Sequence, residues 1–556
     1  MTRSHLINTW VGEALASRPF PPDGRLKPPL RGIGGLAIYE MASTIKAWIL
    51  TAAAAMLLAA CDGNGKGRDG DEEVDVPDGV DTDTSTEPDA AGDPDGVTDG
   101  DGTADPDLDI PPEADLDAVE DGPPPPPPGC PVGFDTDTGT LFYVDPASGA
   151  DTNDGSEASP WRSIQYVVDN LVDCTDKDGV PLNDGAPVKS GDTIFLVGAE
   201  GHDQTVEITG CYNTDYVKIK ALVLHEPRVA FVHMRGSAYW RIEGLTFFNN
   251  SGGTRFRAED HDVRGEAHHI EVMNNHFTSG ELMTAEEFET QASTGVWLLG
   301  ADHVTVQCNT FYKVGQAMTV PGEYIDILDN RVEFFSLDGI ATSGAHNRYL
   351  RNVIYDSVKQ NDTDHDDFYQ NHMGANPDVS TDLEIAYNVF MNRYSDALPL
   401  DLQGPTQCLS AFEEGPKTDI RVYNNVCKTD HYHGISWADT NDSVVINNTV
   451  VGGTELPGLP AGSEEWPDHT WISIEGDGNT VRNNLVTLNN SGGDHNIEIT
   501  GSDVDVYFSD WAALDLSLRE GSPAIDAGSA DGAPSDDVTG AARDGTPDVG
   551  AYEFIP

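Results

Sequence analysis

The chain has 556 residues, of which 95 are acidic and 31 are basic, so its formal net charge is −64. A charge this negative excludes a nucleic-acid-binding surface, which must be basic, and argues against docking on anionic lipid. The sequence contains no phosphate-binding GxxxxGK[ST] loop, no HExxH motif and no CxxC pair, so nucleotide-dependent, zinc-protease and thioredoxin-like activities are not indicated. We therefore expect neither nucleic acid nor nucleotide among the partners.

Residues 1–60 are interpreted as a pre-sequence that carries an export signal. Lys46 precedes the apolar stretch 47–57, which has the length of a signal peptide and is too short to span a bilayer, and Met41 is the expected initiator. The stretch ends in Leu58-Ala59-Ala60-Cys61, which resembles the lipoprotein box of bacterial lipoproteins. The resemblance implies lipidation of Cys61 and anchoring at the bacterial cell envelope, on the outer membrane or cell surface. An ordinary signal peptide is the alternative.

Residues 61–129 are predicted to form a disordered tether. Between residues 62 and 122 there are 23 acidic and two basic side chains and almost no large apolar ones. Such a segment buries too little apolar surface to offset chain entropy, and its charges repel one another. Residues 123–128 are consecutive prolines, which favour a stiff polyproline II rod. A lipid anchor, a long spacer and a folded module form a layout typical of surface display.

Six further cysteines follow Cys61 in the chain. An exported protein meets an oxidising compartment, where cysteines form disulfides. The sequence leaves all 15 pairings open, although closure of a local loop is plausible for two of them, and buried free thiols are the alternative. The six are Cys130, Cys174, Cys211, Cys308, Cys408 and Cys427, and the local loop would join Cys408 to Cys427.

Residues 130–505 contain an internal repeat. Short apolar strands recur, each beside a turn that contains Asn. The aligned Asn positions are 275, 309, 330, 352, 388, 425, 448 and 484, with spacings of 34, 21, 22, 36, 37, 23 and 36. A spacing of 21 to 23 matches one turn of a solenoid of parallel strands, and the larger spacings indicate one turn with an inserted loop. Asn tolerates left-handed backbone angles and hydrogen-bonds its neighbours, so we expect Asn side chains to stack at a recurring bend.

Both ends of this region support a capped solenoid. The amphipathic run 163–169 resembles the opening of bacterial β-helix proteins, which implies a helix that covers the first turn, and 522–528 with 547–553 resemble the C-terminal segment of the same proteins. Together with the Asn repeats, these segments resemble the pectate lyase superfamily over most of 140–556. The resemblance implies an all-β, right-handed parallel β-helix solenoid over 130–505, with 506–556 as its C-terminal segment. This fold hosts lyases, hydrolases, epimerases and adhesins, so it does not specify a reaction.

The two consecutive enlarged turns, 352→388 and 388→425, indicate where chemistry would lie. Neighbouring turns of a solenoid stack, so their insertions are expected to wall one groove. The first contains Asp364-His365-x-Asp367-x-x-Gln370, which is similar to a His-x-Asp-Gly-Ile-Gln motif of β-helix proteins linked to polysaccharide processing, with Phe368-Tyr369 in place of Gly-Ile. Alternation along a strand predicts His365, Asp367 and Tyr369 on one face. A His beside carboxylates suits acid–base chemistry near neutral pH.

The candidate site residues fall into three groups, and a solvated acidic loop is the alternative for the third. Exposed aromatic rings in the second group are expected to stack on sugar rings, and carboxylates in the third could bind Ca²⁺. The candidate catalytic residues are His365, Asp367, Gln370, Tyr369, Arg393 and His433; the candidate substrate-binding residues are Lys359, Gln403, Tyr432 and Trp437; and the candidate calcium ligands are Asp364, Asp366, Asp396 and Asp401.

The leading functional hypothesis is a surface-anchored, monomeric carbohydrate-active protein that acts on polysaccharide. A lyase or epimerase for a uronic-acid-containing glycan would use Ca²⁺ to neutralise the sugar carboxylate, and His365 or Tyr369 as the base. A glycoside hydrolase would pair Asp366 or Asp367 with a carboxylate of the next turn. A non-catalytic glycan-binding or adhesive surface protein is the alternative from a different class.

Overall fold

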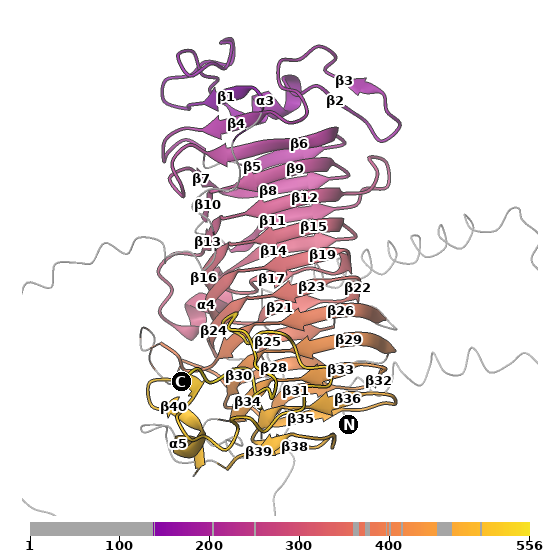
Figure 1. Ribbon diagram of the computed structural model, residues 1–556. Coiled ribbons are helices and arrows are strands. Elements are labelled where there is room, and N and C mark those ends of the chain that lie inside the picture. The colour runs from indigo at the N-terminus through magenta and orange to yellow at the C-terminus, as the bar shows by residue number, and fades with distance from the viewer. Residues whose placement is uncertain are drawn as a thin grey trace, which may run out of the picture. The chain divides into compact units, whose positions relative to one another are not determined.

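The structure is a computed structural model that describes residues 130, 137, 139–202, 205–248, 252–359, 366–372, 379–395, 397, 399, 402–412, 415–452, 470–500 and 503–556. The predictions for the pre-sequence, Cys61 and the tether lie outside these residues. The described chain winds through three sheets, named sheets 1, 2 and 3 in the order of each turn, and the turns stack in one column (Figure 1). Strands within each sheet pair in parallel with the strand one turn away. The prediction of an all-β parallel β-helix solenoid is confirmed.

The strands of the three sheets recur in a regular order along the chain. Sheet 1 contains β1 (Leu141–Val144), β4 (Thr193–Leu196), β6 (Tyr212–Ala221), β9 (Ala238–Glu243), β12 (His268–Met273), β15 (Asp302–Gln307), β18 (Gly322–Glu323), β19 (Ile325–Leu328), β22 (Gly344–Ala345), β23 (Arg348–Leu350), β26 (Ser380–Ala386), β29 (Lys417–Tyr423), β32 (Thr440–Asn441), β33 (Val444–Ile446) and β36 (Thr480–Arg482), with the antiparallel additions β2 (Cys174–Thr175) and β3 (Pro181–Leu182). Sheet 2 contains β7 (Arg228–Val229), β10 (Thr246–Phe248), β13 (His276–Thr278), β16 (Thr310–Val314), β20 (Arg331–Phe335), β24 (Val353–Ser357), β27 (Val389–Met391), β30 (Val426–Thr429), β34 (Thr449–Gly452), β37 (Leu485–Val486) and β39 (Ile497–Glu498). Sheet 3 contains β5 (Thr205–Thr209), β8 (Phe231–Arg235), β11 (Gly253–Glu259), β14 (Ser293–Leu299), β17 (Met318–Thr319), β21 (Asp338–Thr342), β25 (Asp366–Asn371), β28 (Thr406–Ala411), β31 (His433–Trp437), β35 (Trp471–Ile474) and β38 (Leu488–Asn489).

The interior is a set of apolar columns that run along the solenoid axis. On sheet 2, Phe247, Phe277 and Phe311 stack with ring centroids 4.5 and 4.7 Å apart. Ile354 and Phe390 continue the same register in later turns. Each such ring is fully buried or nearly so, which contributes about 2 to 3 kcal/mol per side chain relative to exposure. A single turn cannot bury this face alone, so stacking of turns is what stabilises the fold.

The first turn is covered by α3 (Ile164–Asn170), as the amphipathic run predicted. The Ser163 hydroxyl caps the helix by accepting a hydrogen bond from the Tyr166 N–H, and Ile164, Val167 and Val168 are buried. Such a cap prevents edge-to-edge pairing of the first strands. A second helix, α4 (Ala285–Gln291), lies in the enlarged turn between Asn275 and Asn309. None of the helices in the described part of the chain is long or apolar enough to cross a membrane.

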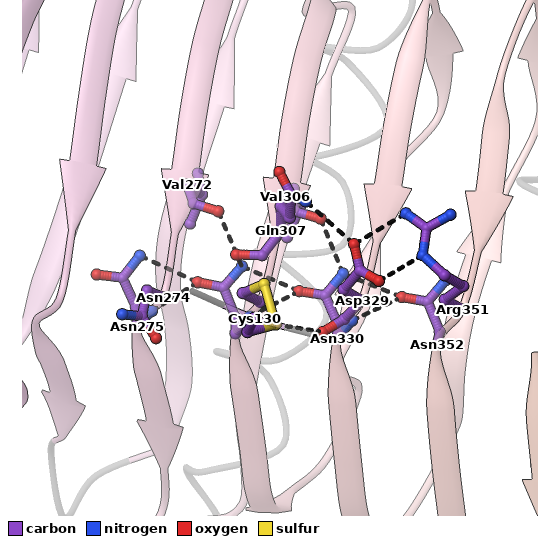
Figure 2. Close-up of a disulfide and its surroundings, with 12 residues drawn as sticks. Cys130, Val272, Asn274, Asn275, Val306, Gln307, Asp329, Asn330, Arg351 and Asn352 are labelled. Carbon is purple, nitrogen blue, oxygen red and sulfur yellow. Dashed lines mark hydrogen bonds and ion pairs between the residues drawn. A yellow bond between two sulfur atoms is a disulfide. The ribbon is translucent and has the colours of Figure 1, made fainter. Parts of the chain in front are cut away.

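The recurring Asn residues form one buried ladder at the bend between sheets 1 and 2. The backbone N–H of Asn330 donates to Oδ1 of Asn352 at 3.0 Å, while Nδ2 of Asn330 donates to the same oxygen at 3.1 Å and to the Val306 carbonyl at 2.8 Å (Figure 2). The same pattern repeats along the column. The members of this Asn ladder are Asn275, Asn309, Asn330, Asn352, Asn388, Asn425, Asn448, Asn484 and Asn496.

The bend differs from the expectation in one respect, because the left-handed residue is the one before each ladder Asn. These preceding residues have φ between +51° and +58°. Half of the eight that precede positions 275 to 484 are themselves Asn, as in Asn274 and Asn424, which tolerates this region best after Gly. The ladder Asn supplies the hydrogen bonds, and its predecessor makes the turn.

All six described cysteines form disulfides. The pairs are Cys130–Cys308, Cys174–Cys211 and Cys408–Cys427. The local closure of Cys408 with Cys427 is confirmed, and the free-thiol alternative is wrong. Figure 2 shows Cys130 bonded at the bend beside the Asn ladder, where it ties residue 130 to a turn that lies 178 residues later in sequence.

The C-terminal segment forms a second, smaller core on the outer face of sheet 2. It contains α5 (Val504–Tyr507), which spans the predicted boundary at 505/506, and the antiparallel pair β40 (Phe508–Asp510) and β41 (Asp515–Leu518). Phe508, Leu516 and Leu518 pack with Tyr355 and Met391 of sheet 2. The segment therefore covers apolar side chains that would otherwise face solvent.

Candidate active site on the outer face of sheet 3

The two enlarged turns lie side by side, as their sequence spacing predicted. β25, β28 and β31 are consecutive strands of sheet 3. Their preceding loops also touch, since the Lys359 N–H donates to the Leu402 carbonyl at 2.7 Å, and Val358 bridges to Gln403. The described ends of the two insertions therefore meet at the corner between sheets 2 and 3.

Asp367 is the centre of the described site. It is fully buried, and it accepts hydrogen bonds from the Ser410 hydroxyl on β28 and, at 3.4 Å, from Nε2 of Gln370 on its own strand. Buried carboxylates are retained only where such donors satisfy them. The prediction placed Asp367 and Gln370 together, and the structure brings them into contact.

Asp367 and Gln370 share the outer face because two consecutive residues between them turn inward. Phe368 and Tyr369 both belong to the hydrophobic core. β31 repeats this arrangement: Gly434 and Ile435 occupy the two middle positions, and Nδ1 of His433 lies 2.9 Å from the Ser436 hydroxyl. Ser410 and Ser436 are register partners on neighbouring strands. Asp367 and His433 are thus both bonded to one row of serines across neighbouring strands.

The strand register adds a second carboxylate that the sequence reasoning did not consider. Asp338 on β21 is the parallel partner of Asp367, and Asp367 is in turn the partner of Gln407 on β28. Asp338 is half-buried, and Gln316 donates to its Oδ2 at 3.0 Å. A shared local pattern could have identified it: Asp338 and His433 each precede a Gly-Ile pair in different turns.

Gln407, the register partner of Asp367 on β28, carries an unsatisfied polar atom. Its side chain is 4% exposed, and its Oε1 has no hydrogen-bond partner among the described residues. A buried acceptor without a partner costs about 1 to 3 kcal/mol. Its position beside Asp367 makes it a suitable acceptor for a ligand hydroxyl.

Aromatic rings border the row at β31. The Tyr432 ring lies 4.1 Å from His433 and 5.0 Å from Trp471, and Phe412 lies 4.5 Å from His433, measured between ring centroids. Tyr432, His433 and Trp471 are half-buried, and Phe412 is exposed. The expectation that Tyr432 contributes an accessible ring to the site agrees with this placement.

Two other rings were expected in the groove, and this expectation was wrong. Tyr369 and Trp437 are 0% and 2% exposed and stack on each other within the core at a centroid distance of 6.2 Å. The paired inward positions of β25 break simple alternation, so Tyr369 does not share the face of Asp367. Burial also raises the pKa of Tyr369 well above its usual value, which makes it unsuitable as a base.

Arg393 lies on the sheet 2 side of the corner and does not join the row. Its guanidinium pairs with Asp430, and its exposed fraction is 6%. Gln403 is buried and donates to the Ser395 carbonyl at 2.8 Å, so both side chains hold the inserted loop. Lys359 is exposed and packs beside Gly404. The structure therefore separates Arg393 from Asp367, which the predicted site had combined.

The structure does not describe four of the predicted site residues. His365, Asp364, Asp396 and Asp401 lie outside the described residues. Asp366 is described and half-buried. Within the described ranges no group of three or more Asp, Glu, His or Cys side chains could hold a metal ion. Binding of Ca²⁺ by the four predicted carboxylates stays a prediction.

The buried carboxyl group of Asp356 binds the backbone at residues 394 and 395, which follow β27. Asp356 is fully buried at the end of β24 and accepts hydrogen bonds from the backbone N–H groups of Tyr394 and Ser395 at 2.7 and 2.8 Å. Burial raises the pKa of Asp356 to about 6 despite these bonds and the nearby Lys428. The unfolded chain releases this proton near its ordinary value of 3.8, so the group lowers stability as the pH rises from about 4 to about 6.

We expect Asp356→Asn to remove this pH dependence. The free energy of unfolding of the variant minus that of the wild type should rise by about 2 kcal/mol between pH 4 and pH 7, because one pKa unit corresponds to about 1.4 kcal/mol and the carboxyl of the unfolded chain is already partly ionised at pH 4. Urea unfolding at a series of pH values measures the difference. Asp419→Asn, at an exposed position of sheet 1, should leave the curve unchanged; a flat difference for Asp356→Asn would show that its carboxyl titrates normally.

No protein-family model matches the chain, and no curated protein matches it. Solved structures similar to it include PfbA, a surface adhesin of Streptococcus pneumoniae, with 13% identity and a TM-score of 0.36 over 54% of this chain and 78% of that one. Others are the GH136 lacto-N-biosidase from Eubacterium ramulus (12%, 0.33, over 61% and 68%) and the PL6 family polysaccharide lyase Pedsa3628 from Pseudopedobacter saltans (12%, 0.30, over 57% and 84%). At these TM-scores the likenesses assign neither a family nor an activity.

Proposed function

We propose that the chain is an exported carbohydrate-active enzyme that cleaves polysaccharide at the outer face of sheet 3. The observation that carries the proposal is the register row Asp338–Asp367–Gln407, with Ser410, Ser436 and His433 beside it and the rings of Tyr432 and Trp471 at its edge. Carboxylates beside hydroxyl-binding amides and aromatic rings are the groups that a sugar polymer requires for recognition and acid–base chemistry.

The paired carboxylates favour hydrolysis. Asp338 and Asp367 are register partners on neighbouring strands, whose backbones lie about 4.8 Å apart. This spacing lets their carboxyl groups adopt the separation of about 5 to 5.5 Å that retaining glycosidases use. Asp367 accepts two hydrogen bonds and is suited to attack the anomeric carbon as a carboxylate. Asp338 would give its proton to the departing glycosidic oxygen and then remove a proton from the water that hydrolyses the ester.

A lyase or epimerase for a uronic-acid-containing glycan is the second candidate. The observation that favours it is His433, a half-buried imidazole held by the Ser436 hydroxyl beside the row, which could remove the C5 proton of a uronate. Ca²⁺ held by Asp364, Asp366, Asp396 and Asp401 would neutralise the sugar carboxylate. Arg393 cannot serve as this cation without leaving Asp430.

Product masses distinguish the candidates. The full chain would be incubated with neutral and acidic polysaccharides, with Ca²⁺ or with a chelator, and the products read by mass spectrometry. Hydrated oligosaccharides that persist with the chelator support the hydrolase, and products lacking the elements of water that require Ca²⁺ support the lyase. Binding without any product would establish the glycan-binding or adhesive alternative, and neither binding nor product would overturn the proposal.

We also propose export and anchoring through Cys61 as a monomer at the cell envelope. The three disulfides support an oxidising compartment, since such bonds are rare in the cytosol. Mass spectrometry of the native N-terminal peptide tests the anchor: a diacylated or triacylated Cys61 is expected, and an unmodified or differently cleaved terminus contradicts it.

A further inference from the structure

A cavity lies on sheet 1, on a different sheet from the candidate active site. It has a volume of about 530 Å³ and lies between the outer face of β29, β33 and β36 and the C-terminal residues 531–535. This volume is in the range of ligand-binding pockets, about 300 to 1,000 Å³. None of its lining residues belongs to the row on sheet 3.

The floor of the cavity is apolar. Val445 points into the core, so its neighbours Val444 and Ile446 face outward and line the cavity. Tyr387 and Tyr423 form one side, with ring centroids 5.4 Å apart in an edge-to-face arrangement. A flat apolar floor beside aromatic rings complements the C–H face of a pyranose.

The rim offers hydrogen-bonding groups whose charges exclude an anionic ligand. Arg482 donates to the side chain of Asp531 at 2.7 Å and also pairs with Asp494, and Arg421 lies 3.2 Å from Asp382. Both guanidinium groups are thus neutralised by carboxylates. Their remaining N–H groups and the carboxylate oxygens can bind hydroxyl groups, whereas a carboxylated or phosphorylated ligand would meet surplus negative charge.

The outer wall is held in place before any ligand binds. Residue Asp536, next to the wall segment, accepts a hydrogen bond on its side chain from the Tyr387 hydroxyl at 2.8 Å and on its carbonyl from Asn424 at 2.7 Å and Arg543 at 3.2 Å. A preformed wall lowers the ordering cost of binding.

We propose that this cavity is a binding site for one to two residues of a neutral glycan, separate from the site on sheet 3. It would hold a polysaccharide to the protein without taking part in bond cleavage. The inference does not depend on sheet 3 being catalytic, because its residues come from other strands and from the C-terminal segment.

A cavity-filling substitution tests the proposal. Thr480 lines the cavity on β36 and is half-buried, so Thr480→Trp should fill it. Thr305 is a matched control, since it is a half-buried outward-facing Thr of the same sheet outside the cavity. The full chain and the variants Thr480→Trp, Thr305→Trp and His433→Ala would be applied to an array of neutral and acidic glycans, with unchanged thermal unfolding as the criterion of folding.

At least one neutral glycan is expected to bind the wild type, the Thr305→Trp variant and the His433→Ala variant, and to bind Thr480→Trp at least tenfold more weakly. Glycans whose binding is lost only in His433→Ala report on sheet 3 and test the proposed function instead. The inference is overturned if no neutral glycan depends on position 480, or if only acidic glycans do. If Thr480→Trp fails to fold, Val444→Glu replaces it, because Val444 also lines the cavity. The same weakening of neutral-glycan binding is then expected for Val444→Glu, and its absence overturns the inference.

Discussion

Asp367→Asn is expected to reduce the rate of product formation at least 100-fold while the protein stays folded. The substitution keeps the shape of the side chain and an oxygen that can accept the Ser410 hydroxyl. The longer bond from Nε2 of Gln370 to the second oxygen is lost. It removes the negative charge and the acid–base capacity, which contribute about 10² to 10⁴ in rate where a positioned side chain transfers a proton. Initial rates on the most active glycan, with thermal unfolding measured in parallel, check the prediction.

Controls separate chemistry from packing. Asp338→Asn should cause a comparable loss if the carboxylate pair is the catalytic unit, and Asp419→Asn on the exposed face of sheet 1 should retain the wild-type rate. In a hydrolase the double variant Asp338→Asn/Asp367→Asn should be little worse than either single variant, because residues that act as a unit are non-additive. Full activity in Asp367→Asn would show that the Asp338–Asp367 pair does not catalyse the reaction.

Much of the fold was predictable because the same short sequence pattern recurs in every turn that contains a ladder Asn. Each ladder Asn is followed by a short apolar strand, and this pairing alone defines the bend between sheets 1 and 2 and the number of residues per turn. The positions of the insertions were predictable because the residues beyond the 21 to 23 of one turn must project from the stack of turns. The residue that makes the left-handed turn was misassigned, since Asn occupies both positions in several repeats.

The candidate site was predicted only in part because strand alternation fails within β25. Two adjacent inward residues, Phe368 and Tyr369, place Asp367 and Gln370 on one face and remove Tyr369 from it. No sequence pattern of period two anticipates such a pair. Asp338 was missed for a related reason: it lies in a turn of minimal spacing, where no insertion drew attention, although register brings it beside Asp367.

Asn352→Leu is expected to lower the free energy of unfolding by at least about 3 kcal/mol. Oδ1 of Asn352 accepts from both the backbone N–H and Nδ2 of Asn330 at 3.0 and 3.1 Å, and its Nδ2 donates to the Ile327 carbonyl at 2.8 Å. Leu has nearly the same volume but removes all three bonds; Nδ2 of Asn330 keeps its bond to the Val306 carbonyl at 2.8 Å, whereas the Asn330 N–H loses its acceptor and the Ile327 carbonyl loses a donor. A buried polar group that loses its partner costs about 1 to 3 kcal/mol. Globular domains have only about 5 to 15 kcal/mol in total, so this loss is large.

Urea unfolding followed by far-ultraviolet circular dichroism measures the effect, with Asn490→Leu at an exposed position as the matched control. The control should unfold within about 0.5 kcal/mol of the wild type, as surface substitutions generally do. An equally small change in Asn352→Leu would mean that water replaces the side chain at the bend, and that the apolar columns alone hold neighbouring turns in register. The expected large loss would instead show that each rung of the Asn ladder fixes the two turns on either side of it, which is the condition for the Asp338–Asp367 pairing one sheet away.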